Sequence, residues 1–450
     1  MFRKLKIFVF FWICGLIYAD KVIILTDIHF NPYADCSKIP LYCSKLNDLI
    51  EKPVEQWSFS EVKPSQYEEE TNYSLLSTAL SSFKNQVESD DNVSIFLTGD
   101  MLAHGFNMRY KYYKLFSSQD DITAFSAKTL LFVIQQIHKT YSKSTIYFVL
   151  GNNDTDMGDY MLPSDEWLLS IANRLSKYIP ESYQVQFTNQ FMSGGFYSIP
   201  LNHQLQIIGI NNNVFSHHTQ DSRGMAVANF EINWLNAQLA KLTRAGKYAI
   251  ILQHIPLGAD AYSSINKSKP VMLLNEQLQL EYVNTLRKFN KNISAIYAGH
   301  LHSEYLENIE SIPLIGTIAL NRRNGNYVGA KLLDYSNNTG KLNKFTTYTF
   351  TDNQESTPQW SQLYSYPDSY NTTDSINNFI KSFPSDITNI QAKLYQRSYD
   401  GNSILHPQPI HNNIYWGYYF CFMNNTNEIE YSNCMKSFNH TPNPNDITKN

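Results

Sequence analysis

Seven side chains that can bind metal ions stand directly after five apolar runs of the sequence. Each run has the length and composition of a buried strand, and open α/β sheets place their sites at the carboxyl ends of strands. Side chains two residues apart on a strand point the same way, so Asp27 and His29 can reach one ion. We therefore expect these side chains to meet in one metal site. The runs and their followers are residues 22–25 with Asp27 and His29, 93–99 with Asp100, 146–151 with Asn152, 248–253 with His254, and 293–299 with His300 and His302.

The order of these residues resembles that of a known family. The chain reads D-x-H at Asp27, G-D at Asp100, G-N-x-D at Asn152, H at His254 and G-H-x-H at His300. This ordered set resembles the calcineurin-like metallophosphoesterases. The resemblance implies an α/β fold, a two-sheet sandwich flanked by helices. It also implies that Asp27, His29 and His302 hold a first ion, that Asn152, His254 and His300 hold a second, and that Asp100 bridges the two.

The ligand types indicate which ions and which reaction fit. Imidazoles with one acidic oxygen ligand on each ion suit Zn²⁺ or another first-row metal better than Ca²⁺ or Mg²⁺. The expected cofactor is therefore two divalent metal ions, with Zn²⁺ as the first choice. Two such ions can share a carboxylate and hold a hydroxide in line with phosphorus. The reaction implied is metal-dependent hydrolysis of a phosphoric ester, by attack of a metal-bound hydroxide on the phosphorus.

Four further features resemble the acid sphingomyelinase and sphingomyelinase-like phosphodiesterase branch of that family. The branch implies a small C-terminal helical domain that ends in paired cysteines. We expect no saposin-like module before Asp27, so the sphingomyelinase-like phosphodiesterases are the closer match. The features are the D-I-H loop with a nearby cysteine pair, T-G-D at Asp100 followed by Ala103 and His104, H-I-P at His254 followed by Gly258, and P-x-W-x-x-L-Y at Pro358, Trp360, Leu363 and Tyr364.

Two residues near Asp100 are the candidate catalytic side chains. His104 matches the histidine that the branch places near the leaving group, and the resemblance implies that it donates a proton there. Where the branch reads G-N-H-E or G-N-H-D, this chain reads G-N-N-D, so Asn153 replaces a histidine. An amide is no proton donor for a leaving group, but it can hydrogen-bond a phosphoryl oxygen. The G-N-N-D run also resembles endopolyphosphatases, whose phosphoanhydride substrates have good leaving groups.

The first 19 residues have the pattern of a secretory signal peptide. Arg3, Lys4 and Lys6 form a positive region, and residues 7–17 form an apolar core that is short for a membrane span. Ala19 is a small residue suited to cleavage, and an uncleaved anchor is the alternative. We expect a secreted or extracytoplasmic protein without a stable membrane span after cleavage.

Cysteine and sequon usage agree with export. Four cysteines remain after the signal segment, an even set in an oxidising context. Of the three possible connectivities, the local one is the simplest, Cys36 with Cys43 and Cys421 with Cys434. Glycosylation in a eukaryotic host would use the N-x-S/T sequons at Asn72, Asn92, Asn266, Asn292, Asn337, Asn371, Asn424 and Asn439.

Composition excludes several classes of protein. A hydrophobic fraction of 43% and a charged fraction of 17% indicate a globular chain rather than a disordered one. The net charge is −4 and no basic stripe stands out, so we expect no nucleic acid partner. The expected partner is a small phosphorylated substrate, namely a nucleotide, a CDP-alcohol, a phospholipid headgroup or polyphosphate. We expect the chain to be a monomer.

Strand and helix patterns alternate along the chain, which predicts a sheet with helices on both faces. Helices are expected over residues 73–89, 122–141, 165–178, 229–242 and 278–289, and further strands over 205–210 and 345–350. Residues 30–64 are expected to form a long loop that leaves the metal ligands. We predict a signal peptide at 1–19, a calcineurin-like metallophosphoesterase domain at 20–339 and a sphingomyelinase-type C-terminal domain, mainly helical, at 340–450.

The pattern as a whole predicts a secreted phosphodiesterase with a dinuclear metal site, which acts on nucleotide-type or phosphocholine-type substrates. One alternative is a sphingomyelin phosphodiesterase or an endopolyphosphatase. Another is a catalytically impaired relative that serves as a binding protein. Retention of all seven ligand types argues against the impaired relative.

Overall fold

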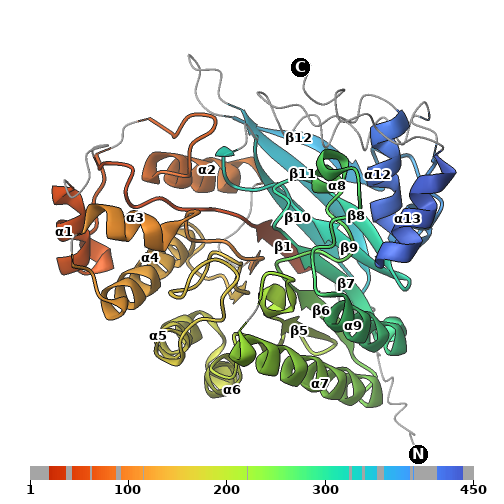
Figure 1. Ribbon diagram of the computed structural model, residues 1–450, viewed down its shortest axis with the longest axis horizontal. Helices are drawn as coiled ribbons and strands as arrows, with labels where there is room; N and C mark the ends of the chain where they lie inside the picture. Colours follow the sequence, from red (N-terminus) through yellow and green to blue (C-terminus); the bar gives the residue numbers. More distant parts are fainter. Residues whose placement is uncertain are drawn as a thin grey trace, which may run out of the picture.

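Two mixed β-sheets form the centre of the computed structural model, and helices flank them (Figure 1). This arrangement confirms the predicted two-sheet sandwich. The described residues are 20–36, 43–60, 63–87, 93–114, 116–219, 221–323, 327–336, 340–351, 359–385, 389 and 413–438. The predicted signal peptide, residues 1–19, lies outside them.

The first sheet holds the first three of the strands that precede predicted ligands. Its order is β12-β11-β10-β1-β2-β3, with β1, β2 and β3 parallel and β10 antiparallel to β1. Because parallel strands end at the same edge, the residues after β1, β2 and β3 come together there. The strands are β1 (Asp20–Leu25), β2 (Ser94–Leu97), β3 (Ile146–Phe148), β10 (Val328–Tyr335), β11 (Leu342–Thr351) and β12 (Gln359–Tyr366).

The second sheet holds the two remaining ligand strands. Its order is β4-β5-β6-β7-β9-β8, and β5, β6, β7 and β9 run parallel to one another. The short strands β4, β8 and β9 were not predicted, and neither was the eight-residue strand β10 of the first sheet. The strands are β4 (Tyr197–Pro200), β5 (Leu205–Gly209), β6 (Tyr248–Leu252), β7 (Ile293–Ala298), β8 (Leu306–Ile309) and β9 (Ile312–Gly316).

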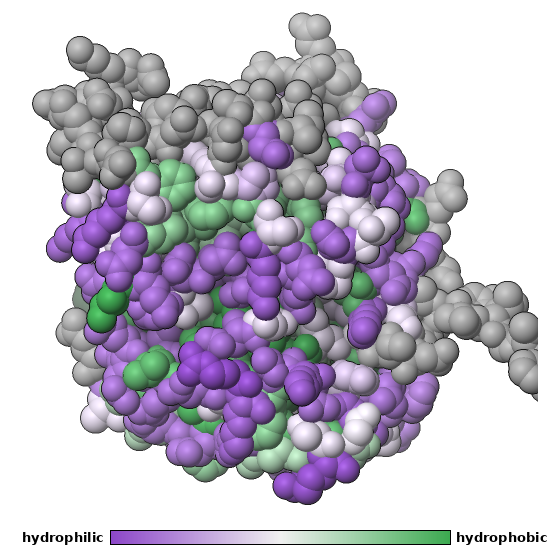
Figure 2. Space-filling model, turned by 90° about the vertical axis from the view of Figure 1, so that its right-hand side faces the viewer, coloured by the Kyte–Doolittle hydropathy of each residue, from purple (hydrophilic) through white to green (hydrophobic). Residues whose placement is uncertain are grey.

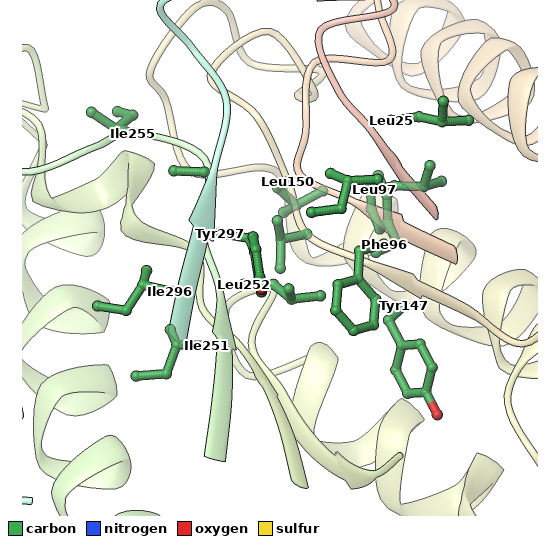
Figure 3. Close-up of a cluster of buried hydrophobic side chains, with 14 of the residues drawn as sticks. Leu25, Phe96, Leu97, Tyr147, Leu150, Ile251, Leu252, Ile255, Ile296 and Tyr297 are labelled. Carbon is green, nitrogen blue, oxygen red and sulfur yellow. The ribbon is translucent and has the colours of Figure 1, made fainter. Parts of the chain in front are cut away.

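Apolar side chains from both sheets fill the space between them (Figure 3). Phe96 on β2 meets Tyr297 on β7, with ring centroids 6.0 Å apart, and Leu252 on β6 is fully buried nearby. Burial of each large apolar side chain contributes roughly 1.5–3 kcal/mol. This core fixes the two sheets against each other, and thereby the two halves of the site at their edges.

The predicted long helices all form, and two of them begin earlier than predicted because an N-cap residue lies further upstream. The helix predicted from residue 122 begins earlier, because Ser118 and Asp121 form a capping box before α4. The helix predicted from residue 229 begins at Ser222, after an Asp221 cap. The α-helices are α1 (Ser44–Glu51), α2 (Tyr73–Gln86), α3 (Phe106–Tyr113), α4 (Gln119–Thr140), α5 (Asp165–Leu175), α6 (Gln184–Phe191), α7 (Ser222–Arg244), α8 (Ala261–Lys267), α9 (Glu276–Lys288), α10 (Ile376–Lys381), α12 (Asn413–Asn424) and α13 (Glu428–Ser437). The 3₁₀ turns are η1 (Val54–Gln56), η2 (Ser176–Tyr178), η3 (Glu181–Tyr183), η4 (Asn212–Phe215) and η5 (Asn290–Asn292).

The segment predicted as a long loop after β1 contains a short helix. Cys43 caps α1 through its Sγ and forms a disulfide with Cys36, as predicted. Trp57 follows α1 and donates its indole N–H to the carbonyl of Leu49. Helix α1 has only eight residues, so its apolar positions are too few to show a helical period, which is why the helix was missed.

The C-terminal region is partly sheet and partly helix. Strands β11 and β12 continue the first sheet, so the residues just after 340 extend the sheet that contains β1. The W-x-x-L-Y signature, which was expected in a mainly helical domain, lies on strand β12, and Trp360 there packs on Phe83 of α2 with ring centroids 4.6 Å apart. Pro358 lies outside the described residues. Helices α12 and α13 then provide the predicted helical part (Figure 1).

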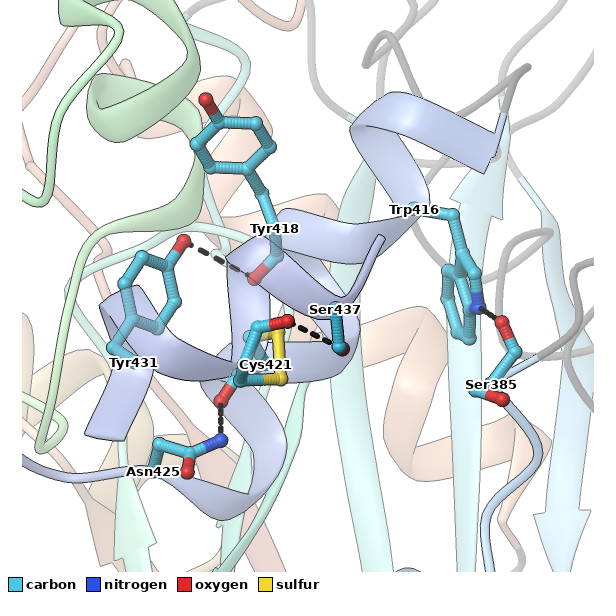
Figure 4. Close-up of a disulfide and its surroundings, with 8 residues drawn as sticks. Ser385, Trp416, Tyr418, Cys421, Asn425, Tyr431 and Ser437 are labelled. Atoms are coloured by element: carbon cyan, nitrogen blue, oxygen red, sulfur yellow. Dashed lines mark hydrogen bonds between the residues drawn. A yellow bond between two sulfur atoms is a disulfide. The ribbon is translucent and has the colours of Figure 1, made fainter. Parts of the chain in front are cut away.

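The second predicted disulfide, between Cys421 and Cys434, joins α12 to α13 (Figure 4). The Tyr431 hydroxyl donates to the Tyr418 carbonyl at 3.2 Å, which is a second tie between the two helices. Asn425 Nδ2 donates to the Cys421 carbonyl at 2.8 Å. The helix pair is thus held by its own contacts, and α12 packs on β8 and α8.

The outer surface shown in Figure 2 is mostly hydrophilic, and hydrophobic side chains appear there as separate, smaller areas. Within the described residues, no helix combines the length and the apolar character needed to cross a bilayer.

A buried carboxyl on α7 makes stability depend on pH. Glu231 is fully buried, Asn211 N donates to its Oε1 at 2.6 Å, and burial raises its pKa from 4.5 to about 8. Between pH 4.5 and about pH 8 the unfolded chain has released this proton while the folded chain still keeps it. The free energy of unfolding therefore falls as the pH rises through this range. Glu231→Gln is expected to be clearly more stable than the parent at pH 8 and nearly equal at pH 5.

Urea unfolding midpoints at the two pH values measure this effect. Glu166→Gln, a change at an exposed position on α5, is the matched control and should follow the parent at both pH values. A Glu231→Gln protein with the same pH dependence as the parent would show that the carboxyl is ionised in the folded chain.

Candidate metal centre

The predicted ligands follow β1, β2, β3, β6 and β7 and meet where the edges of the two sheets face each other. The first sheet brings Asp27, His29, Asp100 and Asn152, and the second brings His254, His300 and His302. The structure thus brings together all seven residues, although up to 275 positions of sequence separate them. They form two clusters of donor atoms, here called the first and second cluster.

The first cluster consists of Asp27, His29, His302 and one oxygen of Asp100. The Nε2 atoms of His29 and His302 are 3.0 Å apart. Asp27 Oδ1 lies 3.5 Å from His302 Nε2 and 3.8 Å from His29 Nε2. Asp100 Oδ2 lies 3.4 Å from His29 Nε2. All four side chains are buried, so the donor atoms converge beneath the molecular surface.

The second cluster consists of Asn152, His254, His300 and the same oxygen of Asp100. Asn152 Oδ1 lies 2.9 Å from His254 Nε2 and 3.0 Å from His300 Nδ1. The two imidazole nitrogens are 3.3 Å apart. Asp100 Oδ2 lies 3.3 Å from His254 Nε2. Asp100 Oδ2 therefore belongs to both clusters, which is the position that a bridging ligand requires.

The tautomers of two imidazoles test whether a cation fits these clusters. His29 Nδ1 lies 3.1 Å from the Leu102 carbonyl, and His254 Nδ1 lies 2.8 Å from the Thr98 carbonyl. A carbonyl only accepts, so each Nδ1 carries the hydrogen and, in the neutral ring, each Nε2 presents a lone pair to its cluster. Second partners of this kind orient metal-binding histidines in known sites. The residues present therefore fit two divalent cations.

The electrostatics of the clusters agree with that fit. Burial lowers the pKa of His29 and of His302 well below the usual range and that of His300 to about 3, so these rings are neutral. Burial opposes ionisation of Asp100, yet the positive charge of His254, whose own pKa Asp100 raises to about 9 against the effect of burial, holds the pKa of Asp100 well below its usual range. Three neutral imidazoles and an ionised shared carboxylate are the protonation states that bind a metal ion, and a bound cation would displace the protons of His254 and of Asp27, whose pKa burial raises to about 7.

The backbone of the ligand loops is strained. Non-glycine residues in the left-handed region cost of order 1–3 kcal/mol each and persist where the surroundings impose them. Here the hydrogen bonds Asp27 N to the Gly99 carbonyl and His29 N to the Asp100 carbonyl, at 3.0 and 2.9 Å, lock two loops together. Such strain is typical of functional sites. The φ angles are 48° at Asp27, 47° at His29, 56° at Asp100, 72° at His300 and 57° at His302.

Gly151 leaves the room that Asp100 needs. A Cβ on Gly151 would lie 2.1 Å from both the backbone nitrogen and Oδ1 of Asp100. Gly151→Ala must therefore displace the shared carboxylate. Loss of a residue that supports a metal ligand typically costs ~10–100-fold. Because this change moves the ligand itself, we expect kcat/KM on bis-p-nitrophenyl phosphate to fall by at least about a hundredfold. Metal content per chain should fall with it.

Gly246→Ala is the control, because Gly246 lies in an exposed turn after α7 and a Cβ there meets open space. Its positive φ of 64° predicts a small loss of stability but unchanged kcat/KM. If Gly151→Ala behaved like Gly246→Ala in activity and metal content, the close packing around Asp100 would have no functional role.

His104 lies at the rim of the first cluster. Its ring stacks on that of His29, with centroids 3.9 Å apart and an interplanar angle of 15°, and its Nδ1 lies 3.0 Å from Glu70 Oε1. The side chain is about one third exposed, at 32%. With Nδ1 engaged by the carboxylate, Nε2 is the nitrogen left to serve a substrate. This placement is compatible with the predicted role as proton donor.

Asn153, the other predicted catalytic residue, contacts Asp100. Its backbone N–H donates to Asp100 Oδ1 at 2.8 Å, and its side-chain Nδ2 donates to Asp100 Oδ2 at 2.9 Å. The residue is buried. In this arrangement Asn153 fixes the orientation of the shared carboxylate, and its predicted contact with a phosphoryl oxygen stays a prediction.

Two acidic residues that support the site were missed by the sequence analysis. Glu70 holds His104, and the hydrogen bond and charge of His104 lower the Glu70 pKa although burial opposes this. Asp154 accepts backbone N–H groups of Met101 and Leu102 with one oxygen and of Gly151 with the other. The D of G-N-N-D could have pointed to Asp154, whereas Glu70 sits in a run of three glutamates that carries no signal.

Comparison with curated proteins finds two relatives of one kind. The chain is 22% identical over 295 residues to acid sphingomyelinase-like phosphodiesterase 3b of Mus musculus, a match that covers 60% of this chain and 61% of the relative. It is 21% identical over 333 residues to the protein of that name from Homo sapiens, with 68% of this chain and 70% of the relative covered. The match thus spans less than two thirds of the mouse relative.

Solved structures give more remote matches. A dimetal phosphatase from Danio rerio has a TM-score of 0.43 and 11% identity, with 73% of this chain and 95% of that chain covered. GAP50 of Plasmodium, described as the anchor in the inner membrane complex, has a TM-score of 0.39 and 12% identity, with 77% and 88% covered. At these scores we draw no argument from either structure.

The comparison with family models gives the assignment. The model of the calcineurin-like phosphoesterases matches residues 20–304, which is more than half of the chain and includes all seven predicted ligands. The chain belongs to the calcineurin-like phosphoesterase family.

Proposed function

We propose that the protein is a secreted phosphodiesterase with a dinuclear metal site, which hydrolyses phosphodiester or phosphoanhydride bonds. The observation that carries the proposal is the meeting of two donor clusters at one oxygen, Asp100 Oδ2. Membership of the family supports phosphoric ester hydrolysis, and both relatives above carry the name phosphodiesterase. The proposed ligands are the seven residues of the first and second clusters.

The chemistry divides between the bound ions and the chain. Two divalent cations, for which Zn²⁺ is our first choice, would polarise the phosphoryl oxygens and lower the pKa of a water molecule at the site. Asp100 holds the two clusters at a fixed separation, and Asn153 holds Asp100. His104 stands at the open rim, where a leaving alkoxide needs a proton. Each of these groups acts on a phosphate placed across both clusters.

Export is the second part of the proposal. The signal-like segment at residues 1–19 and the two local disulfides support it, because disulfides persist in oxidising compartments. We propose the division into a signal peptide at 1–19, a catalytic domain at 20–339 and a C-terminal domain at 340–450, with β11 and β12 of the latter continuing the catalytic sheet.

The substrates that we propose are nucleotide-type or phosphocholine-type. The sphingomyelin phosphodiesterase and endopolyphosphatase alternatives predict other rankings. A panel of ATP, CDP-choline, polyphosphate and sphingomyelin in micelles, tested on the purified protein, separates them. We expect soluble phosphoanhydrides to turn over faster than sphingomyelin. Faster turnover of sphingomyelin than of ATP and CDP-choline would contradict this ranking.

Hydrolysis of bis-p-nitrophenyl phosphate tests the activity itself. The purified chain should release p-nitrophenolate in the presence of Zn²⁺ or another first-row metal and should stop after removal of the metal with a chelator. Metal binding without any hydrolysis of this ester or of the panel above would instead support the impaired relative that serves as a binding protein.

A further inference from the structure

Glu70 gathers three side chains at the edge of the first cluster. Its Oε1 lies 3.0 Å from His104 Nδ1, 2.8 Å from Arg323 Nη1 and 3.6 Å from Arg109 Nη2. The Glu70 side chain is only 2% exposed, whereas the guanidinium-bearing side chains of Arg109 and Arg323 are 34% and 39% exposed. A single buried carboxylate thus holds two arginines that still face solvent.

The charges of this group do not cancel. Glu70 contributes one negative charge and the two arginines contribute two positive charges, so the group has at least one positive charge in excess. Asn321 Nδ2 donates to the other oxygen of Glu70 at 3.2 Å, which fixes the carboxylate from its second side. The surface that results is pre-organised and cationic, and it is suited to an anion.

The arginines have hydrogen-bond donors to spare. A guanidinium carries five N–H donors in a planar fork that matches phosphate. Within the described part of the chain, the Arg323 guanidinium contacts only Glu70, through one nitrogen. The contact from Arg109 to Glu70, at 3.6 Å, is longer than a hydrogen bond. Both side chains can therefore bind an anion and keep their place beside Glu70.

The position of the two arginines beside His104 indicates which part of a substrate they would bind. His104 shares Glu70 Oε1 with the arginines, and its ring stacks on the predicted ligand His29. If His104 serves the leaving group, as proposed above, then Arg109 and Arg323 lie on the leaving-group side of the site. An anion held there belongs to the part of the substrate that departs.

We propose that Arg109 and Arg323 form a subsite for a leaving group that already carries phosphate charge in the bound substrate, so that the enzyme prefers phosphoanhydrides to esters whose leaving group is uncharged until the bond breaks. The inference rests on the proposed function and names its substrate class. In the reaction, water oxygen bonds to phosphorus and the bond from phosphorus to the bridging oxygen breaks. The leaving phosphate keeps the bridging oxygen with its electron pair, and the protons of the water pass to the two products or to solvent. The arginines balance the charge that grows on the leaving phosphate.

Two substrates that differ in the leaving group test the subsite. Thymidine triphosphate leaves pyrophosphate, and the p-nitrophenyl ester of thymidine monophosphate leaves p-nitrophenolate, while the nucleoside and the reacting phosphorus are the same. Arg323→Gln and Arg109→Gln should each lower kcat/KM for the triphosphate by about 10–100-fold, the range for a hydrogen bond to a charged group. The loss on the ester should be at least about tenfold smaller.

Two further variants sharpen the result. Arg323→Lys keeps the positive charge but loses the planar fork of N–H donors. Its kcat/KM for the triphosphate should therefore lie between that of the parent and that of Arg323→Gln. Arg244→Gln, at the exposed end of α7, is the matched control and should leave both substrates unaffected. Activity on the ester shows that each variant is folded.

The outcomes separate this inference from the proposed function. Equal losses on both substrates, or no loss on the triphosphate, would overturn the subsite and leave the arginines as neutralising partners of Glu70. A parent enzyme that hydrolyses the ester but not the triphosphate would also overturn the subsite and leave the proposed function intact. A parent enzyme that hydrolyses neither of these substrates, nor bis-p-nitrophenyl phosphate, nor any member of the substrate panel in the presence of metal would overturn the proposed function.

Discussion

Asp100→Asn is expected to lower kcat/KM on bis-p-nitrophenyl phosphate by at least about a thousandfold. Asp100 Oδ2 lies 3.4 Å from His29 Nε2 and 3.3 Å from His254 Nε2, so one substitution weakens both clusters. Charge stabilisation by bound metal is worth several kcal/mol, and each 1.36 kcal/mol is about tenfold in rate. The amide keeps the shape of the carboxylate but loses its charge. Metal content and initial rates of the purified variant measure the effect.

Asp48→Asn is the matched control for this substitution. Asp48 lies on α1, is exposed and pairs with Lys52 at 3.1 Å in a surface ion pair, which contributes little. The control should keep both metal content and rate. An Asp100→Asn protein with the metal content and rate of the parent would refute the bridging role of Asp100.

His104→Ala is expected to have an effect that depends on the leaving group. General acid catalysis is typically worth ~10²–10⁴-fold and matters most for poor leaving groups. A diester with an alkoxide leaving group should therefore lose at least about a hundredfold in kcat/KM, within that range. A p-nitrophenyl ester should lose much less, because p-nitrophenolate departs without a proton. The measurement is kcat/KM of the variant on one ester of each kind.

His203→Ala is the control for this substitution, and equal losses on the two esters are the contradicting result. His203→Ala changes an exposed histidine between β4 and β5 and should leave both esters unaffected. His104 stacks on His29, so its removal could also disturb the first cluster. Equal losses on the two esters would mean that His104 supports His29 or positions phosphate, and the assignment as proton donor would be wrong.

The ligand set was predictable because its signal is local. Each ligand follows a short apolar run, and the alternation of side chains in a strand makes the pair Asp27 and His29 readable from spacing alone. The family resemblance added the pairing of residues from different strands, such as Asn152 with His254 and His300. In the structure, Asn152 Oδ1 lies 2.9 Å from His254 Nε2 and 3.0 Å from His300 Nδ1.

The supporting residues were not predictable because their contacts are distant in sequence. Glu70 meets His104 across 34 positions and Arg323 across 253, and nothing in a run of three glutamates indicates which one is buried. The role of Asn153 as a clamp on Asp100 depends on the turn that follows β3. The left-handed backbone of Asp27, which sequence propensity disfavours, is imposed by packing between loops.

The C-terminal region shows the same limit. The signature around Trp360 was expected in a helical domain, yet it forms β12, because pairing with β11 supplies hydrogen bonds that local sequence does not reveal. The local disulfide between Cys421 and Cys434, by contrast, followed from proximity in sequence and is present.

Metal content of the purified, exported protein tests the central claim most directly. The seven converging ligands, with Asp100 shared between the two clusters, predict close to two first-row divalent ions per chain by elemental mass spectrometry, expected to be zinc. Removal of both ions by a chelator should abolish hydrolysis of bis-p-nitrophenyl phosphate, and their return should restore it. A metal content near zero, with hydrolysis that is indifferent to the chelator, would contradict the account.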